Sequence, residues 1–345
     1  MQYTIAVSGI NAIDNPGPGT GISRSLKESD LDVRIIGLAY DAMEPGIYMD
    51  WLIDRTYILP YPSAGVESYM SRLSYIHQKE NIDIIIPALD AELPLYMKTE
   101  DIFENMGIKM MIPERESFRK RSKDNLKEIA ANTGLVLPDS KTISSEKDLE
   151  EAAKEYGYPL MVKGPFYEAF CAENRSEVLH HFHALAAKWG FPIILQKYVR
   201  GDEVNLVGLG DGKGGDMGHL AIKKMLITKL GKVWTNVSII NNRIEDAAQK
   251  LVSYLKWKGA FELELIFDNK NDIYYLIEVN PRFPAWLYMA SGCGINLPER
   301  MVKKLLDMPY DTHSNYKAGK LLIRYTGELI KDISDFEKMT TIGEN

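Results

Sequence analysis

The chain has few cysteines and no strong excess of either charge, and both absences limit what it can be. Its 345 residues include only two cysteines, Cys171 and Cys293, which lie far apart in the sequence. Such sparse cysteine does not make a disulfide framework and is typical of a reducing compartment, so we expect a cytoplasmic protein. The formal net charge of −7, from 41 basic and 48 acidic residues, argues against a general nucleic-acid binder.

Long apolar runs are missing as well. No stretch approaches the ~18 apolar residues that a membrane-spanning helix needs. The first ten residues, MQYTIAVSGI, lack the basic segment of a signal peptide, so we expect neither membrane insertion nor a secretory leader. The composition, 45% hydrophobic and 26% charged, is that of an ordinary globular protein.

What the sequence does contain, first, is a series of βα units. Apolar runs at 3–10, 32–40, 82–89 and 108–113 alternate with helical patterns such as 65–80. Near-continuous apolar strands that alternate with helices predict a parallel sheet covered on both faces. We therefore assign residues 1–113 to an N-terminal α/β domain.

The rest of the sequence changes character twice. Residues 114–199 contain a charged helical segment and then the order helix, strand, helix, strand, which predicts a small α+β subdomain. Residues 200–345 are dominated by strands joined by glycine-rich turns, which predicts a mainly antiparallel sheet. Helices are expected near 243–256 and 297–306, and a last strand near 320–328. The predicted fold class is therefore α/β and α+β in three parts.

Polar residues follow a period of two on two consecutive predicted strands. FELELIFD places Glu262 and Glu264 on one face, and YYLIEVNPR places Glu278 and Asn280 on one face before the strand stops at Pro-Arg. A hairpin of these strands brings Glu264 opposite Glu278, where like charges repel. Mg²⁺ removes that repulsion and usually binds one or two carboxylates together with substrate phosphates. A solvent-facing hairpin without a metal is the alternative interpretation.

Two lysines and an apolar link are the other candidate features. Lys163 ends the strand PLMVKG and Lys123 lies in the basic segment FRKRSKDNLKEIA, where each is either a phosphate contact or an ordinary solvated lysine. The link QKYVRGDE can present backbone groups to an adenine edge and Glu203 to ribose hydroxyls, or can be a plain linker.

Taken in order, these elements resemble the ATP-grasp superfamily, and most of all its carbamoyl-phosphate-synthase-like and biotin-carboxylase-like branch of carboxylate–amine ligases. The resemblance covers residues 113–300, and residues 1–113 fit the α/β domain that usually precedes them. It implies an ATP-grasp fold with an N-terminal parallel-sheet domain, a small central α+β subdomain over 114–199, and a C-terminal, mainly antiparallel sheet domain over 200–345.

The resemblance also implies two cofactors, ATP and Mg²⁺, with Mn²⁺ as an alternative metal, and a role for each matching residue. The implied contacts are the ATP phosphates for Lys123 and Lys163, the adenine site for Gln196, Lys197, Tyr198 and Val199, the ribose for Glu203, the metal for Glu264, Glu278 and Asn280, and the transferring phosphate for Arg282.

The implied reaction is ATP-dependent formation of an amide or peptide bond through an acyl-phosphate. The partners would be a small-molecule carboxylate (an amino acid or peptide) and an amine, with no nucleic acid and no membrane, and a homodimer is compatible with the resemblance. Two segments depart from the pattern: KGPFYEAFCAEN holds one glycine where relatives carry a glycine-rich loop, and FPAW follows NPR where carbamoyl-phosphate synthases carry a serine-containing stretch. The alternatives are therefore a non-catalytic ATP-binding or partner-binding protein, and a bicarbonate-using carboxylase or carbamoyl-phosphate-type enzyme.

Overall fold

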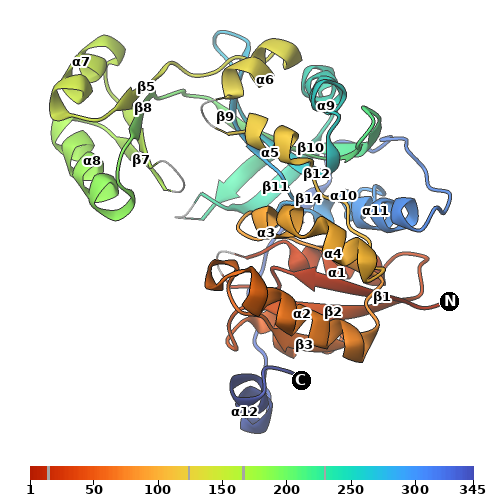
Figure 1. The fold of residues 1–345 in the computed structure, drawn as a ribbon. Helices are drawn as coiled ribbons and strands as arrows, with labels where there is room; N and C mark the ends of the chain where they lie inside the picture. The colour runs from red at the N-terminus through yellow and green to blue at the C-terminus, as the bar shows by residue number, and fades with distance from the viewer. Residues whose placement is uncertain (14–15, 123–124, 165–167, 229–230) are drawn as a thin grey trace. The chain divides into compact units, whose positions relative to one another are not determined.

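The computed structural model describes residues 1–345 except 14–15, 123–124, 165–167 and 229–230. The chain forms two compact units, which are described separately below (Figure 1). Each unit is assembled from segments that are distant in sequence. Unit 1 comprises residues 1–133, 204–264 and 278–345, and unit 2 comprises residues 134–203 and 265–277.

The first sheet of unit 1 is parallel, as the sequence predicts. The expected strand at 108–113 is wrong, because this segment contributes only a single bridge between Lys109 and Ile84. Residues 55–58, which the sequence analysis left unassigned, supply the fourth strand instead. The strand order is β3-β2-β1-β4, with β1 at Tyr3–Ser8, β2 at Val33–Ala39, β3 at Arg55–Ile58 and β4 at Ile84–Ile86.

Helices cover both faces of this parallel sheet. Helix α1 (Gly19–Lys27) belongs to the core on the face that carries Ile5 and Val7, whereas α2 (Val66–Glu80) belongs to the core on the face that carries Ala6. This division follows from the alternation of side chains along a strand. The shorter helices of this region are η1 (Pro45–Tyr48), η2 (Pro62–Ala64), α3 (Leu93–Lys98) and α4 (Glu100–Asn105).

The second sheet has six strands in the order β13-β12-β9-β10-β11-β14. Strand β9 pairs with β10, β10 with β11, and β11 with β14, and all three pairings are antiparallel, as predicted. The last strand is shorter than expected from the sequence. The bounds are β9 Asp202–Asp211, β10 Asp216–Ile227, β11 Val233–Ile239, β12 Lys258–Asp268, β13 Ile273–Asn280 and β14 Leu321–Ile323.

The helices expected near 243–256 and 297–306 are present as α9 (Asn242–Leu255) and α11 (Leu297–Leu305). The charged helical segment forms two short helices, α5 (Arg115–Lys120) and α6 (Leu126–Thr133). Within the described part of the chain, no helix combines the length and apolar character needed to cross a bilayer. Two further helices, α10 (Tyr288–Gly292) and α12 (Ile333–Thr341), were not anticipated from the sequence.

Unit 2 contains a four-stranded antiparallel sheet in the order β5-β8-β6-β7. Two helices, α7 (Glu146–Tyr156) and α8 (Arg175–Trp189), share one apolar core with this sheet (Figure 1). Each helix begins at a capping side chain that accepts a hydrogen bond from a backbone N–H, Ser145 for α7 and Asn174 for α8. The strands are β5 Ser140–Ile143, β6 Leu160–Lys163, β7 Ala169–Ala172 and β8 Ile193–Lys197.

Close packing of β9 against a phenylalanine ring gives a test of the large sheet. A Cβ atom added to Gly208 would lie 2.4 Å from Cζ of Phe261, which is fully buried. We expect Gly208→Ala to lower the free energy of unfolding by about 1–3 kcal/mol, because the core cannot accept the extra methyl group without moving the ring. Urea unfolding measures this, with Gly292→Ala as the control because no atom lies within 4 Å of its added Cβ. Equal unfolding free energies for the two variants would contradict this packing.

Candidate functional site

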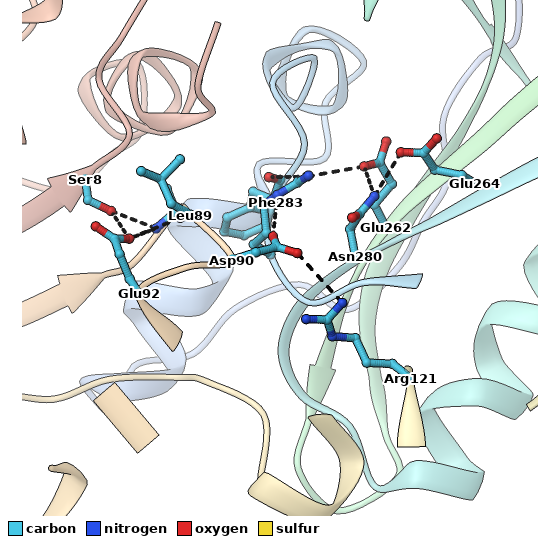
Figure 2. Close-up of polar contacts among 11 residues, drawn as sticks. Ser8, Leu89, Asp90, Glu92, Arg121, Glu262, Glu264, Asn280 and Phe283 are labelled. Atoms are coloured by element: carbon cyan, nitrogen blue, oxygen red, sulfur yellow. Dashed lines mark hydrogen bonds and ion pairs between the residues drawn. The ribbon is translucent and has the colours of Figure 1, made fainter. Parts of the chain in front are cut away.

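The candidate site of unit 1 lies on β12 and β13, where side chains alternate between the two faces of the sheet. Glu262 and Glu264 point to the same face of β12, and the Asn280 amide at the end of β13 joins them. The Asn280 Nδ2 donates to Glu262 Oε2 at 3.0 Å and to Glu264 Oε1 at 2.9 Å (Figure 2). The structure therefore brings together three side chains that the period of two places on one face of their strands.

The orientation of the Asn280 amide suits a metal ligand. Because both hydrogens of its amide nitrogen are directed at carboxylates, Oδ1 is the atom left to bind a cation. Amide and carboxylate oxygens are the ligands that Mg²⁺ prefers. The orientation of the Asn280 amide, with its oxygen available and Glu264 beside it, therefore fits a hard divalent cation.

The positive charges of Lys224 and Arg282 compensate the buried Glu262 and the half-buried Glu264. Lys224 of β10 lies with its Nζ 3.7 Å from Glu264 Oε2, and its side chain is 7% exposed. Burial raises the pKa of Glu264, but the charges of Lys224 and then Arg282 outweigh it and hold the net pKa below its ordinary value. Burial, followed by the Glu264 charge, raises the pKa of Glu262 above its ordinary value. Glu264 is therefore the carboxylate that stays ionised most readily.

Arg282 is held between two carboxylates. Its Nε lies 3.0 Å from Asp90 Oδ1, and its terminal NH1 donates to Glu262 Oε2 at 3.3 Å. Burial lowers the pKa of Arg282, but the surrounding carboxylates, Asp90 first, outweigh burial and raise it above its ordinary value. The guanidinium is thus a fixed positive charge beside the predicted metal ligands.

Glu278 is the remaining residue of the predicted metal set. It is half-buried on β13, and its carboxylate is one of the charges that raise the pKa of Arg282. Among the described residues, no group of three or more His, Cys, Asp or Glu side chains is arranged to hold a metal ion. The role of Glu278 as a metal ligand beside Glu264 and Asn280 stays a prediction.

The loop after β4 delivers Asp90 to Arg282. Glu92, which is fully buried, accepts hydrogen bonds from Ser8 Oγ at 2.6 Å and from the backbone N–H groups of Ala88 and Leu89 at 3.2 and 3.1 Å. Burial raises the pKa of Glu92. These bonds fix the backbone immediately before Asp90 (Figure 2). One short loop therefore joins the parallel sheet to the acidic corner, the name used below for Glu262, Glu264, Asn280 and Arg282 with their partners Asp90 and Lys224.

Unit 2 contains the other predicted nucleotide contacts. Lys163 ends β6 and is 9% exposed, and Gln196 and Lys197 end β8. A cavity of about 700 Å³ in this unit is lined by Lys197, Tyr198 and Val199, together with residues of 136–139 and 268–271. Neither Gln196 nor Lys163 lines this cavity, so the predicted adenine residues are only partly gathered there.

Other predicted residues are placed less fully. Glu203 lies on β9, at the end of a segment of unit 2. Lys123 falls outside the described residues, and so do residues 165–167 of the loop after Lys163. The roles of these residues stay predictions.

Several members of the acidic corner could not be assigned a role from the sequence. Glu262 was placed on the right face but given no role, although its carboxylate contacts Asn280, Arg282 and the Trp286 indole. The period of two was the available signal for Glu262. No local pattern pointed to Asp90 or Lys224, because each comes from another strand or loop and meets the corner only in the folded chain.

Two family models match the chain. A PylC-like N-terminal domain matches residues 23–111, and an ATP-grasp domain matches residues 123–285. A curated relative, the urea amidolyase of Lachancea kluyveri, is 30% identical over 229 residues, which are 60% of this chain and 12% of that protein. The chain thus spans about an eighth of the length of this relative.

Solved structures share the fold. The biotin carboxylase domain of the Hydrogenobacter thermophilus 2-oxoglutarate carboxylase, solved with MgADP, ADP and bicarbonate, superposes with a TM-score of 0.69 at 16% identity over 92% of this chain and 73% of that one. The Staphylococcus aureus N5-carboxyaminoimidazole synthetase, solved with ADP, gives a TM-score of 0.67 at 14% identity over 90% and 80%. The predicted ATP-grasp fold with an N-terminal α/β domain is confirmed.

Removing one anionic ligand tests the metal assignment. We expect Glu278→Gln to weaken Mn²⁺ binding in the presence of ADP at least tenfold, because loss of even an outer-shell partner lowers metal affinity about 10–100-fold. Electron paramagnetic resonance of free Mn²⁺ measures this, with Glu245→Gln on α9 as the control. Wild-type Mn²⁺ affinity in Glu278→Gln would remove Glu278 from the metal set.

Proposed function

Because the chain carries an ATP-grasp domain behind a PylC-like N-terminal domain, we propose that it is an ATP-dependent carboxylate–amine ligase that forms an amide or peptide bond. The observation that carries this proposal is the corner formed by Glu264, Asn280 and Arg282. Phosphoryl transfer is catalysed mainly by positioning and charge neutralisation. A pair of proposed metal ligands beside a fixed guanidinium can supply both.

The proposed reaction has two steps. A carboxylate oxygen of the first substrate attacks the γ-phosphorus of ATP, an O–P bond forms, and the bond to the β-phosphate oxygen breaks to release ADP. The amine of the second substrate then attacks the acyl carbon, the C–N bond forms, and inorganic phosphate leaves. The amine loses one proton in this step, and no described side chain is assigned as its acceptor.

Each residue of the corner has a proposed task. Glu264, Glu278 and Asn280 would hold Mg²⁺, which when bound neutralises charge on the phosphates. Arg282 places its charge where the transferring phosphoryl group becomes negative and then holds the acyl-phosphate. Asp90 keeps the Arg282 guanidinium aligned through its Nε at 3.0 Å.

Unit 2 is proposed to contact the nucleotide. Lys163, with Lys123 as a second cation, would contact the phosphates as point charges. The proposed adenine contacts are Gln196, Lys197 and the backbones of Tyr198 and Val199, and Glu203 would accept bonds from the ribose. The support for these contacts is the order of the residues within the matched ATP-grasp domain.

Buried polar atoms on the same sheet face suggest where a substrate lies. Asn236 of β11 pairs with Lys224, and Lys224 contacts Glu264, so all three share one face. Asn236 is fully buried, and neither atom of its amide has a hydrogen-bond partner within the described structure. Buried amides are almost always paired, so we propose that a polar substrate group completes the bonding of Asn236.

A second candidate reaction uses bicarbonate as the carboxylate. The 30% identity to a urea amidolyase favours it, as does the fold shared with biotin carboxylases. In that reaction bicarbonate would be phosphorylated and the resulting carboxyphosphate would transfer a carboxyl group. The same corner would serve both reactions, so the substrate distinguishes them.

A substrate screen tests the proposed function. We expect Mg²⁺-dependent ADP release to rise at least tenfold with a matched pair of carboxylate and amine from an amino-acid and peptide panel, with an amide found by mass spectrometry. Glu264→Gln is the control and should abolish ADP release. ADP release that depends on bicarbonate alone would favour the carboxylase, and ATP binding without any stimulated release would contradict both enzymes.

Replacing Asn236 separates a substrate contact from a structural residue. We expect Asn236→Leu to raise the free energy of unfolding by about 1 kcal/mol, because it removes a buried amide without partners. We expect the same variant to lower kcat/KM for the carboxylate or amine at least tenfold while leaving the KM for ATP unchanged. Urea unfolding and ADP release measure the two effects. Unchanged kcat/KM would show that Asn236 does not contact a substrate.

A further inference from the structure

Glu262 is a buried carboxylate with many hydrogen bonds, and the proposed reaction has not used it. Its side chain is buried, with the residue 3% exposed. Oε1 accepts from Asn205 Nδ2 at 2.8 Å and from the Trp286 indole Nε1 at 2.7 Å. Oε2 accepts from Asn280 Nδ2 at 3.0 Å and from the Arg282 guanidinium at 3.3 Å. Four donors from four different positions therefore converge on one side chain.

This arrangement defines how Glu262 bonds to its neighbours. Every one of its four contacts is an N–H donor, so both carboxylate oxygens act as acceptors. The bond from the Arg282 guanidinium is charge-assisted.

The same bonds argue against Glu262 as a metal ligand. Both of its oxygens already accept two hydrogen bonds each, and its side chain is 4% exposed. Glu264, by contrast, has a side chain that is 28% exposed and accepts from the Asn280 amide. The two acids of β12 therefore have different tasks.

We propose that Glu262 is a positioning residue that fixes the orientations of the Asn280 amide and the Arg282 guanidinium. Glu262 accepts a hydrogen bond from Asn280 Nδ2, which directs Asn280 Oδ1 toward the proposed metal position. Glu262 also accepts a hydrogen bond from NH1 of Arg282, which directs the opposite edge of the guanidinium toward the proposed phosphate position. This inference rests on the proposed function of the corner. It goes further because one residue, which would contact neither metal nor substrate, is proposed to set the orientation of the other side chains in the corner.

Trp286 and Asn205 are the supports of this positioning residue. They hold Oε1, and a carboxylate whose one oxygen is fixed by two donors cannot rotate its other oxygen away from Asn280 and Arg282. Trp286 is the last residue of the FPAW stretch and is 3% exposed. The structure thus assigns a role in orienting the site to a tryptophan that follows the NPR motif.

The test uses Glu262→Gln, which preserves shape but replaces one acceptor oxygen by an NH₂ group that faces donors. We expect kcat for ADP release to fall about 100-fold, as for a catalytic group displaced by about 1 Å. We also expect the Mg²⁺ concentration for half-maximal rate to rise at least about tenfold, because Asn280 loses its fixed orientation. Rates are expressed per folded molecule.

The matched control is Glu44→Gln. Glu44 is also a buried carboxylate of unit 1, 8% exposed, and accepts from the backbone N–H groups of Tyr40 and Asp41. It should leave kcat and the Mg²⁺ dependence unchanged. A loss of folded protein without a change in kcat or Mg²⁺ dependence in Glu262→Gln would show a merely structural role and overturn the proposal.

A double-mutant cycle tests the link to Arg282. Because Glu262 is proposed to act partly by orienting the guanidinium, Glu262→Gln combined with Arg282→Lys should lower kcat by clearly less than the product of the two single losses. Independent, multiplicative losses would overturn the proposal. Should Glu262→Gln not fold, Trp286→Phe removes one donor and is expected to lower kcat about fivefold, the effect of one hydrogen bond; a wild-type kcat would overturn it.

A binding measurement separates failure of this inference from failure of the proposed function. If the wild-type chain turned over no substrate pair, the ligase proposal would fail, but Mn²⁺ affinity in the presence of ADP would still report on Asn280. Glu262→Gln should then weaken that affinity at least about tenfold relative to both the wild type and Glu44→Gln. Equal affinities in the three proteins would overturn the positioning role.

Discussion

The structure of the candidate site depends on compensating two carboxylates placed two residues apart on one face of β12. Glu262 is buried and Glu264 is half-buried, so both can be ionised only where positive charge and hydrogen-bond donors surround them. Arg282 and Asn280 of the following strand, with Lys224 of β10, supply these groups. The acidic hairpin is therefore a set of charges that stabilise one another, and a bound cation would add to the set.

This compensation also connects distant parts of unit 1. Arg282 contacts both Glu262 of β12 and Asp90. The Asp90 loop is fixed by hydrogen bonds of the buried Glu92 to the Leu89 backbone and to Ser8 at the end of β1 (Figure 2). The parallel sheet is thus bonded to the corner through a chain of polar contacts. In the proposed ligase, such a chain would give the N-terminal domain a direct influence on Arg282.

The sequence predicted the features that local periodicity determines. The alternation in FELELIFD and LIEVNPR was enough to place Glu264 and Asn280 together, and the helical period identified α2, α7, α8 and α9. What it missed depends on long-range contact. Residues 55–58 form a strand only because β2 lies beside them, and residues 108–113 fail to form one because only Lys109 meets β4. The contacts of Asp90, Lys224 and Trp286 are likewise made with partners in other strands or loops, so no local pattern assigns these residues to the site.

The central claim is that a carboxylate is activated by transfer of the γ-phosphoryl group, and oxygen isotope transfer tests it most directly. The carboxylate identified by the substrate screen is labelled with ¹⁸O in both oxygens, and the inorganic phosphate formed in one turnover is analysed by mass spectrometry. An acyl-phosphate intermediate predicts that one ¹⁸O atom moves from the carboxylate to phosphate for every amide formed. Amide formation with unlabelled phosphate would contradict the account.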